Sequence, residues 1–446
     1  MSTLAPLRAG ELRGIRRLDL SCGLTEFPPE IFQLADSLEI LNLSGNALRT
    51  LPDDLHRLHR LRVVFCSDNR FTELPASLGR CAELTTVGFK ANAIEHVPAQ
   101  ALPPKLRWLI LTDNRISKLP DALGACTALQ KLMLAGNRLT ALPPSMADCR
   151  KLELVRIAAN RFTELPRWLL SLPRLAWLAY AGNPFCDEPA ATEAEANSTT
   201  DIEWHRLQLQ GLLGEGASGV IHQALWTRDS GEPRPVAVKL FKADMTSDGL
   251  PRSEVAACLA AGTHSNLIAV EGVITGHPNG AAGMAMRLID PAFRNLAGPP
   301  SLDSCTRDVY AAEVRFTLAA VLSMAGGIAS AASHLHARHI VHGDLYAHNT
   351  LVTPDGRTLL GDFGAASFMP ADSPEVAEAL KRLEVRAFGC LLEELLDRCD
   401  ADEPADAIAT LKALHERCVS EDIAARPSFA QIEHLLKELA GTPVTA

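Results

Sequence analysis

The chain has 446 residues, more than one hydrophobic core normally organises, so two or three domains are expected. Apolar residues make up 47% and charged residues 22%, which excludes a largely disordered chain. The formal net charge of −10 argues against a general nucleic-acid binder. Residues 1–185 hold 23 Lys and Arg against 17 Asp and Glu, a net of +6, whereas the remainder holds 20 against 36, a net of −16. This division predicts two modules with different surfaces.

The sequence near the N-terminus, MSTLAPLRAGELRG, has no apolar stretch of the length of a secretory signal. One long uncharged segment, 316–333, is rich in Ala, Gly and Ser, which favours a buried helix over a membrane span. The 11 cysteines include no C-x-x-C pair, a pattern typical of reduced thiols. We therefore expect a cytoplasmic protein.

The first half contains an asparagine that returns every 22 or 23 residues, from Asn46 to Asn183. Leucines precede it at alternate positions, as Leu41 and Leu43 precede Asn46. This alternation turns one face of each short strand inward, and a single repeat cannot bury that face alone. The Asn side chains suit hydrogen bonds to the turn backbone. The pattern L-x-x-L-x-L-x-x-N resembles the leucine-rich repeat family, which implies an α/β solenoid of about eight strands over residues 1–185.

The strand positions between the leucines are expected to line the concave face of such a solenoid. Several of them carry large apolar side chains or arginine, which favour protein interfaces over solvent. The alternative is that neighbouring segments or the second domain cover them. The residues predicted to bind a protein substrate or regulator are Phe65, Trp108, Ile110, Met133, Arg156 and Trp177.

An acidic, Ala-rich linker is predicted at 186–203, and a glycine-rich strand pair follows it. Gly214, Gly216 and Gly219 precede another apolar run rather than a helix, as expected for a hairpin folded over nucleotide phosphates. A strand then ends in Lys239, and 15 residues later Glu254 lies in a helical stretch. This spacing predicts that Glu254 pairs with Lys239 and directs it at phosphates.

Two acids and an asparagine follow in the order that in-line phosphoryl transfer requires. Asp344 precedes a predicted strand and would accept the proton of the attacking hydroxyl. Asn349 and Asp362 would hold the Mg²⁺ ions that neutralise charge on the phosphates.

The stretch from about Leu207 to Leu439 resembles the eukaryotic-type protein kinase family. The resemblance implies an α+β bilobal kinase domain, placed at 204–442, that uses ATP and Mg²⁺ to phosphorylate protein, with Ser or Thr as the expected acceptor. It identifies 328–342 with the long buried helix and the run into the catalytic loop. It places adenine along the hinge, beneath two residues of the upper strands; the residues concerned are Val220, Ala237, Met286, Arg287, Leu288 and Ile289.

Two positions depart from the family pattern. Gly343 replaces the arginine that normally precedes the catalytic Asp and reads an activating phosphate, and Tyr346 replaces the lysine typical of Ser/Thr kinases. Two alternatives therefore stay open: a nucleotide-binding scaffold of the pseudokinase type, and a small-molecule phosphotransferase, since H-G-D-L also occurs in such enzymes.

The segment after Asp362 is shorter than in the family, and Ser367 and Ser373 are the hydroxyl residues between Asp362 and Glu375. We expect catalysis that does not require phosphorylation of this segment. Glu375 is the best remnant of the A-P-E element. It is predicted to pair with Arg426 and anchor the segment to the lower lobe.

Overall fold

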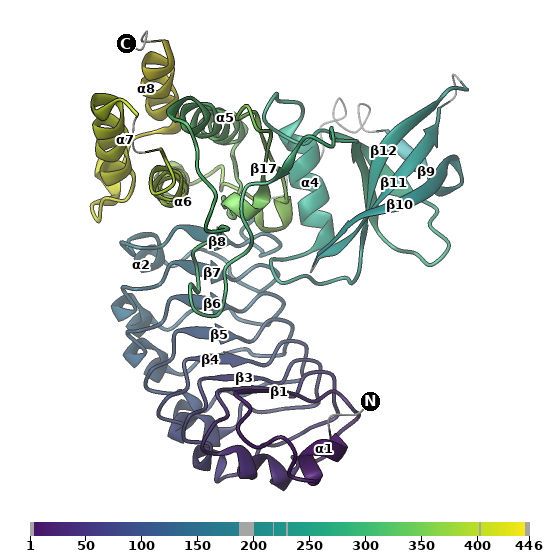
Figure 1. Ribbon diagram of the computed structural model, residues 1–446, viewed down its shortest axis with the longest axis vertical. Helices are drawn as coiled ribbons and strands as arrows, with labels where there is room; N and C mark the ends of the chain where they lie inside the picture. The colour runs from purple at the N-terminus through teal and green to yellow at the C-terminus, as the bar shows by residue number, and fades with distance from the viewer. Residues whose placement is uncertain (1–3, 187–199, 217, 229–230, 401–402, 442–446) are drawn as a thin grey trace. The chain divides into compact units, whose positions relative to one another are not determined.

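The structure is a computed structural model that describes residues 4–186, 200–216, 218–228, 231–400 and 403–441. It divides into two compact units, Met1–Leu175 and Ala176–Ala446, which are described separately (Figure 1). Most of the predicted linker, 187–199, lies outside the described residues.

Short parallel strands in chain order form an eight-stranded sheet, β1 to β8, as the repeat predicted (Figure 1). In each strand the middle residue points inward; Leu41, Leu109 and Leu132 are 0–1% exposed. Their bounds are Arg17–Asp19, Ile40–Asn42, Val63–Phe65, Thr86–Gly88, Trp108–Ile110, Lys131–Met133, Leu154–Arg156 and Trp177–Ala179. The second unit begins at Ala176 and therefore includes β8.

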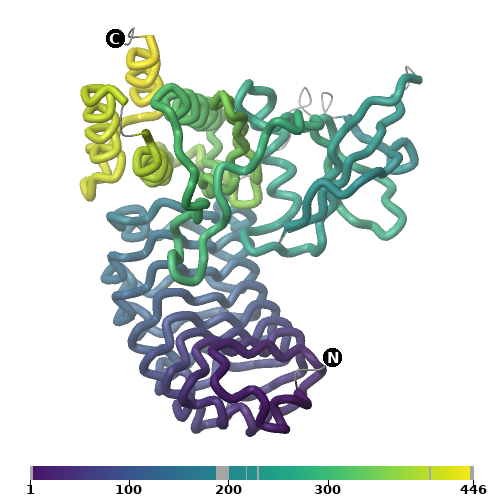
Figure 2. The backbone as a smooth tube through the Cα atoms, viewed as in Figure 1, coloured from purple at the N-terminus to yellow at the C-terminus, as the bar shows by residue number. Residues whose placement is uncertain are grey.

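Short helical turns return the chain between strands, and each coil of the tube in Figure 2 is one such repeat. Most of them start directly after the proline that follows each asparagine; this proline is the N-cap residue, and its ring fixes φ while its backbone stays extended (ψ 122–145°). They are α1 (Leu4–Arg8), η1 (Pro29–Leu34), η2 (Leu55–Arg57), η3 (Ala76–Arg80), η4 (Ala99–Ala101), η5 (Asp121–Ala125), η6 (Pro144–Asp148) and α2 (Arg167–Leu170).

The recurring asparagines form the predicted ladder of buried amides. The Asn114 amide donates to the carbonyls of Phe89, Leu111 and Thr112 at 2.9–3.2 Å, and its oxygen accepts the Ile94 N–H at 2.9 Å. One side chain thus satisfies backbone groups of its own turn and of the adjacent repeat, which confirms the structural role expected for these residues.

The second unit contains a six-stranded sheet in the order β10-β11-β12-β14-β13-β9. The bounds are β9 Asp201–Glu203, β10 Leu207–Glu215, β11 Gly219–Thr227, β12 Pro233–Phe241, β13 Val270–Thr275 and β14 Gly283–Arg287. Strand β9 pairs in parallel with β13, so the last residues assigned to the linker form part of this sheet. The short turn η7 (Trp204–Arg206) follows it, and Trp204 packs on an apolar cluster that includes Trp226 and Val238.

Helix α4 (Pro251–Ala261) follows β12, and the remaining helices form the lower part of the unit. Helix α5 (Leu318–Ala337) packs against α6 (Pro374–Leu396) and α8 (Phe429–Gly441). The other elements are β15 (Arg294–Asn295), β16 (Ile340–Val341), η8 (Ala347–Asn349), β17 (Thr350–Val352), β18 (Thr358–Leu360), η9 (Phe363–Ala365), β19 (Ser367–Phe368), α7 (Ala405–Cys418) and η10 (Ile423–Ala425). The predicted fold class, a repeat solenoid followed by a bilobal α+β kinase-like domain, is confirmed.

Among the described residues, one helix, α5, has the length and composition of a membrane span. Of its most apolar stretch of 18 residues, 61% is buried inside the fold. This burial is what the sequence predicted for the segment as a core helix.

Candidate active site

A pocket lies under the six-stranded sheet and is closed from below by the loop that contains Asp362. Side chains on alternate residues line its roof, because successive residues of a strand point to opposite faces. Lys239 is paired in register with Met284 on one side and with Ile221 on the other. The lining residues are Gly216, Ser218, Gly219, Ile221, Lys239, Glu254, Cys258, Ile268, Val270, Met284, Met286, Gly361, Asp362 and Phe363.

The predicted adenine contact Val220 is wrong. Val220 lies opposite Leu240, one residue from the partner of Lys239, and therefore points to the other face of the sheet. Ile221 is the residue that lines the pocket. The correct residue could have been predicted from the sequence, because the spacing G-x-G-x-x-G-x-V places the apolar contact two residues after the last glycine, at Ile221.

The glycine-rich hairpin lies at the edge of the pocket. Gly216 and Gly219 are among the lining residues, and Gly214 is paired with Ile221 in the β10–β11 register. A Cβ on Gly219 would lie 2.6 Å from the Leu240 carbonyl oxygen, so this position requires glycine. Nothing lies within 4 Å of a Cβ placed on Gly214 or Gly216, which leaves their backbone open to a phosphate chain.

Of the four residues predicted for the hinge, Met286 lies in the pocket wall. This residue lines the pocket and is paired with Ala237, which lies two residues before Lys239 and so shares its face. Strand β14 ends at Arg287, whose N–H donates to the Ala269 carbonyl. Leu288 and Ile289 follow the strand and are half-buried. Met284 is a pocket residue that the sequence reasoning missed, although it lies two residues before Met286.

Lys239 and Glu254 form the predicted ion pair. Their Nζ and Oε1 atoms are 2.5 Å apart, and both side chains are buried. Burial raises the pKa of Glu254 to about 7, opposed by the ammonium group. Burial also lowers the pKa of Lys239, but the carboxylates of Asp362 and Glu254 outweigh this and raise it. Lys239 therefore stays a cation in the pocket.

Asp362 approaches the same lysine, with its Oδ1 atom 3.8 Å from Nζ, and its side chain is about half exposed to the pocket. Its backbone has a φ of 53°, in the left-handed region that costs a non-glycine residue energy. The Asp362 carboxylate accepts the Gly364 N–H, which helps to hold this turn. Such local strain at a loop that carries a candidate metal ligand fits a functional position.

Asp344 and Asn349 lie together on the catalytic loop. The Asn349 amide nitrogen donates to the Asp344 carboxylate at 2.7 Å and to its carbonyl at 3.0 Å. Because the nitrogen is used in this way, the amide oxygen is the atom of this side chain that can act as a metal ligand. The Gly361 N–H donates to the Asn349 carbonyl, which links this loop to the turn at Asp362.

Asn349 and Asp362 are suitable ligands for Mg²⁺. The cation prefers oxygen donors and usually takes one or two from protein and the rest from phosphate and water. Across the described residues, no group of three or more His, Cys, Asp and Glu side chains could hold a metal by itself. Asn349 and Asp362 offer two protein oxygen donors, the number that Mg²⁺ commonly takes from protein when phosphate and water supply the rest.

Glu384 of α6 supports the catalytic loop from below. Its carboxylate accepts the Gly343 N–H at 2.8 Å and contacts the His336 Nε2 atom at 2.7 Å. Burial raises the pKa of Glu384, but these two partners and His342 outweigh it and lower the pKa. Glu384 is thus an anion that fixes the residue before Asp344.

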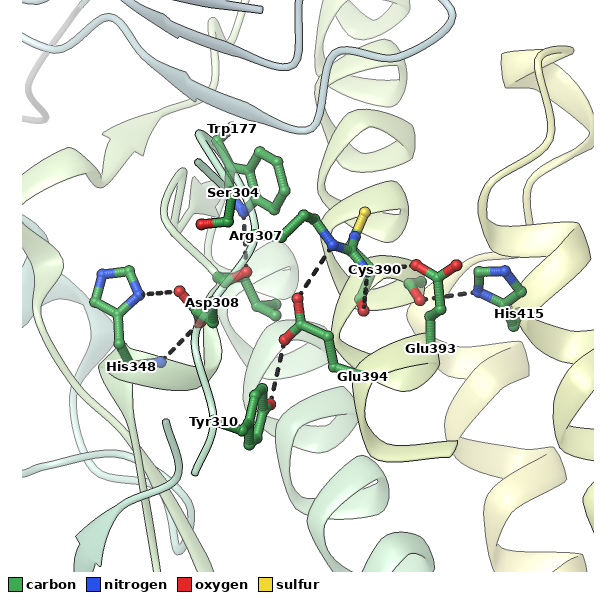
Figure 3. A network of polar contacts seen from close by, with 12 residues as sticks. Trp177, Ser304, Arg307, Asp308, Tyr310, His348, Cys390, Glu393, Glu394 and His415 are labelled. Carbon is green, nitrogen blue, oxygen red and sulfur yellow. Dashed lines mark hydrogen bonds and ion pairs between the residues drawn. The ribbon is translucent and has the colours of Figure 1, made fainter. Parts of the chain in front are cut away.

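The segment between β15 and α5 holds the other end of this loop (Figure 3). The Asp308 carboxylate accepts the His348 N–H at 3.0 Å and lies 2.7 Å from the imidazole Nδ1 atom. Arg307 and Tyr310 both contact Glu394 of α6, at 3.2 Å each. Sequence reasoning missed this network, because its partners are 40 and 84 residues apart.

The predicted ion pair between Glu375 and Arg426 is wrong. Helix α6 begins at Pro374, so Glu375 lies in its exposed first turn. Arg426 is 1% exposed, and its guanidinium donates to the carbonyls of Ser420 and Arg382. Arg426 contacts α6 two turns further along, at the Arg382 carbonyl, and not at the first turn that carries Glu375.

The candidate partner-binding residues differ in exposure. Phe65, Trp108, Ile110 and Met133 are half-buried, and Lys131 lies 4.4 Å above the Trp108 ring. Arg156 and Trp177 are 1% and 2% exposed, so the prediction that they face a partner is wrong. Trp177 is covered by residues of its own unit, and its ring stacks on Tyr346 at 4.2 Å.

Comparison with known proteins agrees with this geometry. Residues 207–388 match the family model described as protein tyrosine and serine/threonine kinase, and residues 13–71 match the model described as leucine rich repeat. The chain therefore carries a protein kinase domain preceded by a leucine-rich repeat region.

The similar curated proteins are kinases of several kinds. Cyclin-dependent kinase 2 of Caenorhabditis elegans is 29% identical over 45% of this chain and 58% of that protein. Tyrosine-protein kinase Abl of Drosophila melanogaster is 27% identical over 52% of this chain and 16% of that protein. A probable serine/threonine-protein kinase of Dictyostelium discoideum is 23% identical over 56% of this chain and 30% of that protein. The matches thus span from 16% to 58% of the length of these relatives.

Among solved structures, a leucine-rich repeat protein of Leptospira interrogans is 28% identical, with a TM-score of 0.38. The match covers 40% of this chain and 46% of that one.

Proposed function

We propose that the chain is a protein kinase that transfers phosphate from ATP, with Mg²⁺, to Ser or Thr hydroxyls. The observation that carries the proposal is the buried Lys239–Glu254 pair with Asp362 at 3.8 Å from the lysine. In protein kinases the lysine–glutamate pair orients the nucleotide phosphates, and the aspartate at the position of Asp362 holds Mg²⁺ beside them. A scaffold that only bound nucleotide would not need the full set of transfer residues.

The residues have separate roles in the transfer. The ammonium group of Lys239, held by Glu254, orients the phosphate chain beneath the glycine-rich hairpin. Asp344 accepts the proton of the attacking hydroxyl, and Asn349 holds the Asp344 carboxylate in place through its amide nitrogen. Mg²⁺ held by Asn349 and Asp362 would supply positive charge next to the phosphate oxygens.

The choice of Ser or Thr rests on the shape of the loop beyond Asp344. Tyr346 is 4% exposed and stacks on Trp177, so two rings are packed together at the second residue after the catalytic acid. A short acceptor side chain needs less room there than a phenol. Phosphoamino-acid analysis of a labelled product tests this, and phosphotyrosine as the main product would contradict it.

Transfer of label separates the three candidate functions. The full-length chain is mixed with γ-labelled ATP, Mg²⁺ and dephosphorylated casein, and separately with a mixture of small metabolites. Label on protein supports a protein kinase, and label on a metabolite alone supports the small-molecule alternative. The absence of transfer together with nucleotide binding supports the scaffold. The matched control is Asp344→Asn, which should bind ATP normally and lose about 10²–10⁴-fold in transfer rate.

We further propose that the repeats recruit a protein substrate or regulator through the half-buried residues Phe65, Trp108, Ile110 and Met133. Large apolar side chains with a cation nearby are typical of such surfaces. A Phe65→Ala/Trp108→Ala variant of the full chain should recover less partner in a pull-down than Phe32→Ala, which removes an aromatic ring outside these strands. Equal recovery would contradict the proposal.

We also propose a cytoplasmic location without a membrane span. The cysteines Cys66, Cys81 and Cys149 are unpaired and buried, and burial raises the pKa of each thiol above its usual value. Reduced, unreactive thiols of this kind suit a reducing compartment.

A further inference from the structure

The strand β8 and the two residues after it lie against the catalytic loop of their own unit. The indole Nε1–H of Trp177 donates to the Leu345 carbonyl at 3.0 Å, directly after Asp344 (Figure 3). The indole ring stacks on Tyr346, with centroids 4.2 Å apart and planes within 7°. Both rings are at least 96% buried. Trp177 therefore fixes the two residues that follow the catalytic acid.

The same segment also holds the chain that follows Asp362. The N–H groups of Tyr180 and Ala181 donate to the Ser367 hydroxyl oxygen at 3.3 and 3.1 Å. The Tyr180 hydroxyl donates to the Phe368 carbonyl at 3.2 Å. Ser367 and Phe368 form β19, which pairs with β16 just before the catalytic loop.

Gly343 makes this close approach possible. Its φ is 71°, and a Cβ added to it would lie 2.8 Å from the Leu178 carbonyl oxygen and 2.6 Å from that of Ala365. No side chain fits there, least of all the arginine that would reach for an activating phosphate. The backbone of β8 occupies that space.

Ser367 is consequently a buried hydrogen-bond acceptor. Its side chain is fully buried and receives two backbone N–H groups. A phosphoryl group on this oxygen would break both bonds and could not be accommodated. One of the two hydroxyl residues between Asp362 and Glu375 is thus used to anchor the segment.

From these contacts we infer that residues 177–181 are a positioning brace that holds the catalytic loop and the segment after Asp362 ready for transfer, in place of an activating phosphate. This inference rests on the proposed kinase function. Trp177 and Tyr180 are positioning residues, because they touch the loop backbone and not the reacting atoms. Displacing a catalytic group by about 1 Å can cost about 100-fold in rate, so a rigid brace is a large advantage.

The test compares the full-length chain with Trp177→Ala, Trp177→Phe and Phe71→Ala. Phe71 is a buried ring of the repeat core that packs edge-on against Phe89, so its removal matches the loss of a ring without touching the loop. Measured quantities are kcat for casein phosphorylation, the dissociation constant for ATP with Mg²⁺, and amide hydrogen exchange across 343–349.

Trp177→Ala should lower kcat by about 10- to 100-fold while ATP affinity stays within about twofold, because the pocket is lined by other residues. Exchange across 343–349 should accelerate in this variant only. Trp177→Phe keeps a stacking ring and should recover most of the loss. A folded Trp177→Ala protein with the kcat and exchange of Phe71→Ala would overturn the inference.

Failure of the proposed function gives a different result. If the unmodified chain transfers no phosphate, the kinase proposal fails. Amide hydrogen exchange alone then tests whether residues 177–181 hold the loop at 343–349. Faster exchange across 343–349 in Trp177→Ala would still support it, and unchanged exchange would overturn it.

Discussion

At the scale of single residues, Gly343 carries the most specific prediction. Gly343→Ala introduces a Cβ at a φ of 71° and within 3 Å of two carbonyl oxygens. We expect a loss of at least about 1–2 kcal/mol in the free energy of unfolding. The control is Gly326→Ala in α5, where nothing lies within 4 Å of the added Cβ and the helix should gain about 0.5–1 kcal/mol. Denaturant unfolding measures both, and equal effects would contradict the account.

Sequence patterns predicted residues that the structure brings together, because each belongs to a short local motif. Lys239 and Glu254 were predicted to pair from their order alone, and they do. Two of the wrong predictions, for Val220 and for the Glu375–Arg426 pair, have local physical causes. Val220 was misplaced by one residue in a strand, which turns a side chain to the opposite face. The Glu375–Arg426 pair failed because the start of α6 depends on how the shortened segment packs.

At the scale of elements, the asparagine ladder should be strongest in the middle of the sheet. Asn114 is 7% exposed and makes four hydrogen bonds to backbone. Asn114→Ala leaves those backbone groups buried without a partner, which should cost about 2–4 kcal/mol. Asn46, the first asparagine of the ladder, is more exposed, so water can replace part of its hydrogen bonding and Asn46→Ala should cost less. Thermal unfolding of both variants checks the order, and a reversed order would contradict it.

The contact between α6 and the segment before α5 predicts that the free energy of unfolding depends on pH. Burial raises the pKa of Glu394 from 4.5 to about 7. The charges of Arg307 and Arg398 and the hydrogen bond from the Tyr310 hydroxyl oppose this shift. A raised pKa means that the stability from the protonated form is complete below pH 4.5 and is lost as the pH rises through about 7.

Glu394→Gln should therefore remove part of the fall in unfolding free energy over this window, at most about 3 kcal/mol. Above this pH window the difference in unfolding free energy between the Glu394→Gln variant and the unmodified protein should stay constant. Unfolding measured at half-unit pH steps is the check. Parallel curves from pH 4 to 8 would show that Glu394 does not titrate as the fold implies.

Elements with a strong repeat were predictable, and contacts between distant elements were not. The period of 22 or 23 residues fixed the strands because every repeat must bury the same face. The same sequence marks Trp177 as an exposed strand residue, because its position in the repeat is equivalent to that of Trp108. Its burial depends on Tyr346, 169 positions later, which no local pattern reveals.

At the scale of the molecule, the repeat and kinase regions are joined by a segment with two roles. Strand β8 completes the repeat pattern in sequence, and its side chains pack within the second unit. A kinase fragment cut within the linker would lack Trp177 and Tyr180. The repeats are therefore expected to matter for catalysis through β8, independently of any partner that they bind.

The most direct test of this account is phosphate transfer by the full-length protein after complete removal of phosphate with a phosphatase. Rates are measured with γ-labelled ATP before and after treatment, and Asp344→Asn is measured beside them. The account predicts equal rates for the treated and untreated protein, and a loss of at least about 100-fold in Asp344→Asn with ATP binding retained. Transfer that disappears with the phosphate, or that persists in Asp344→Asn, would contradict it.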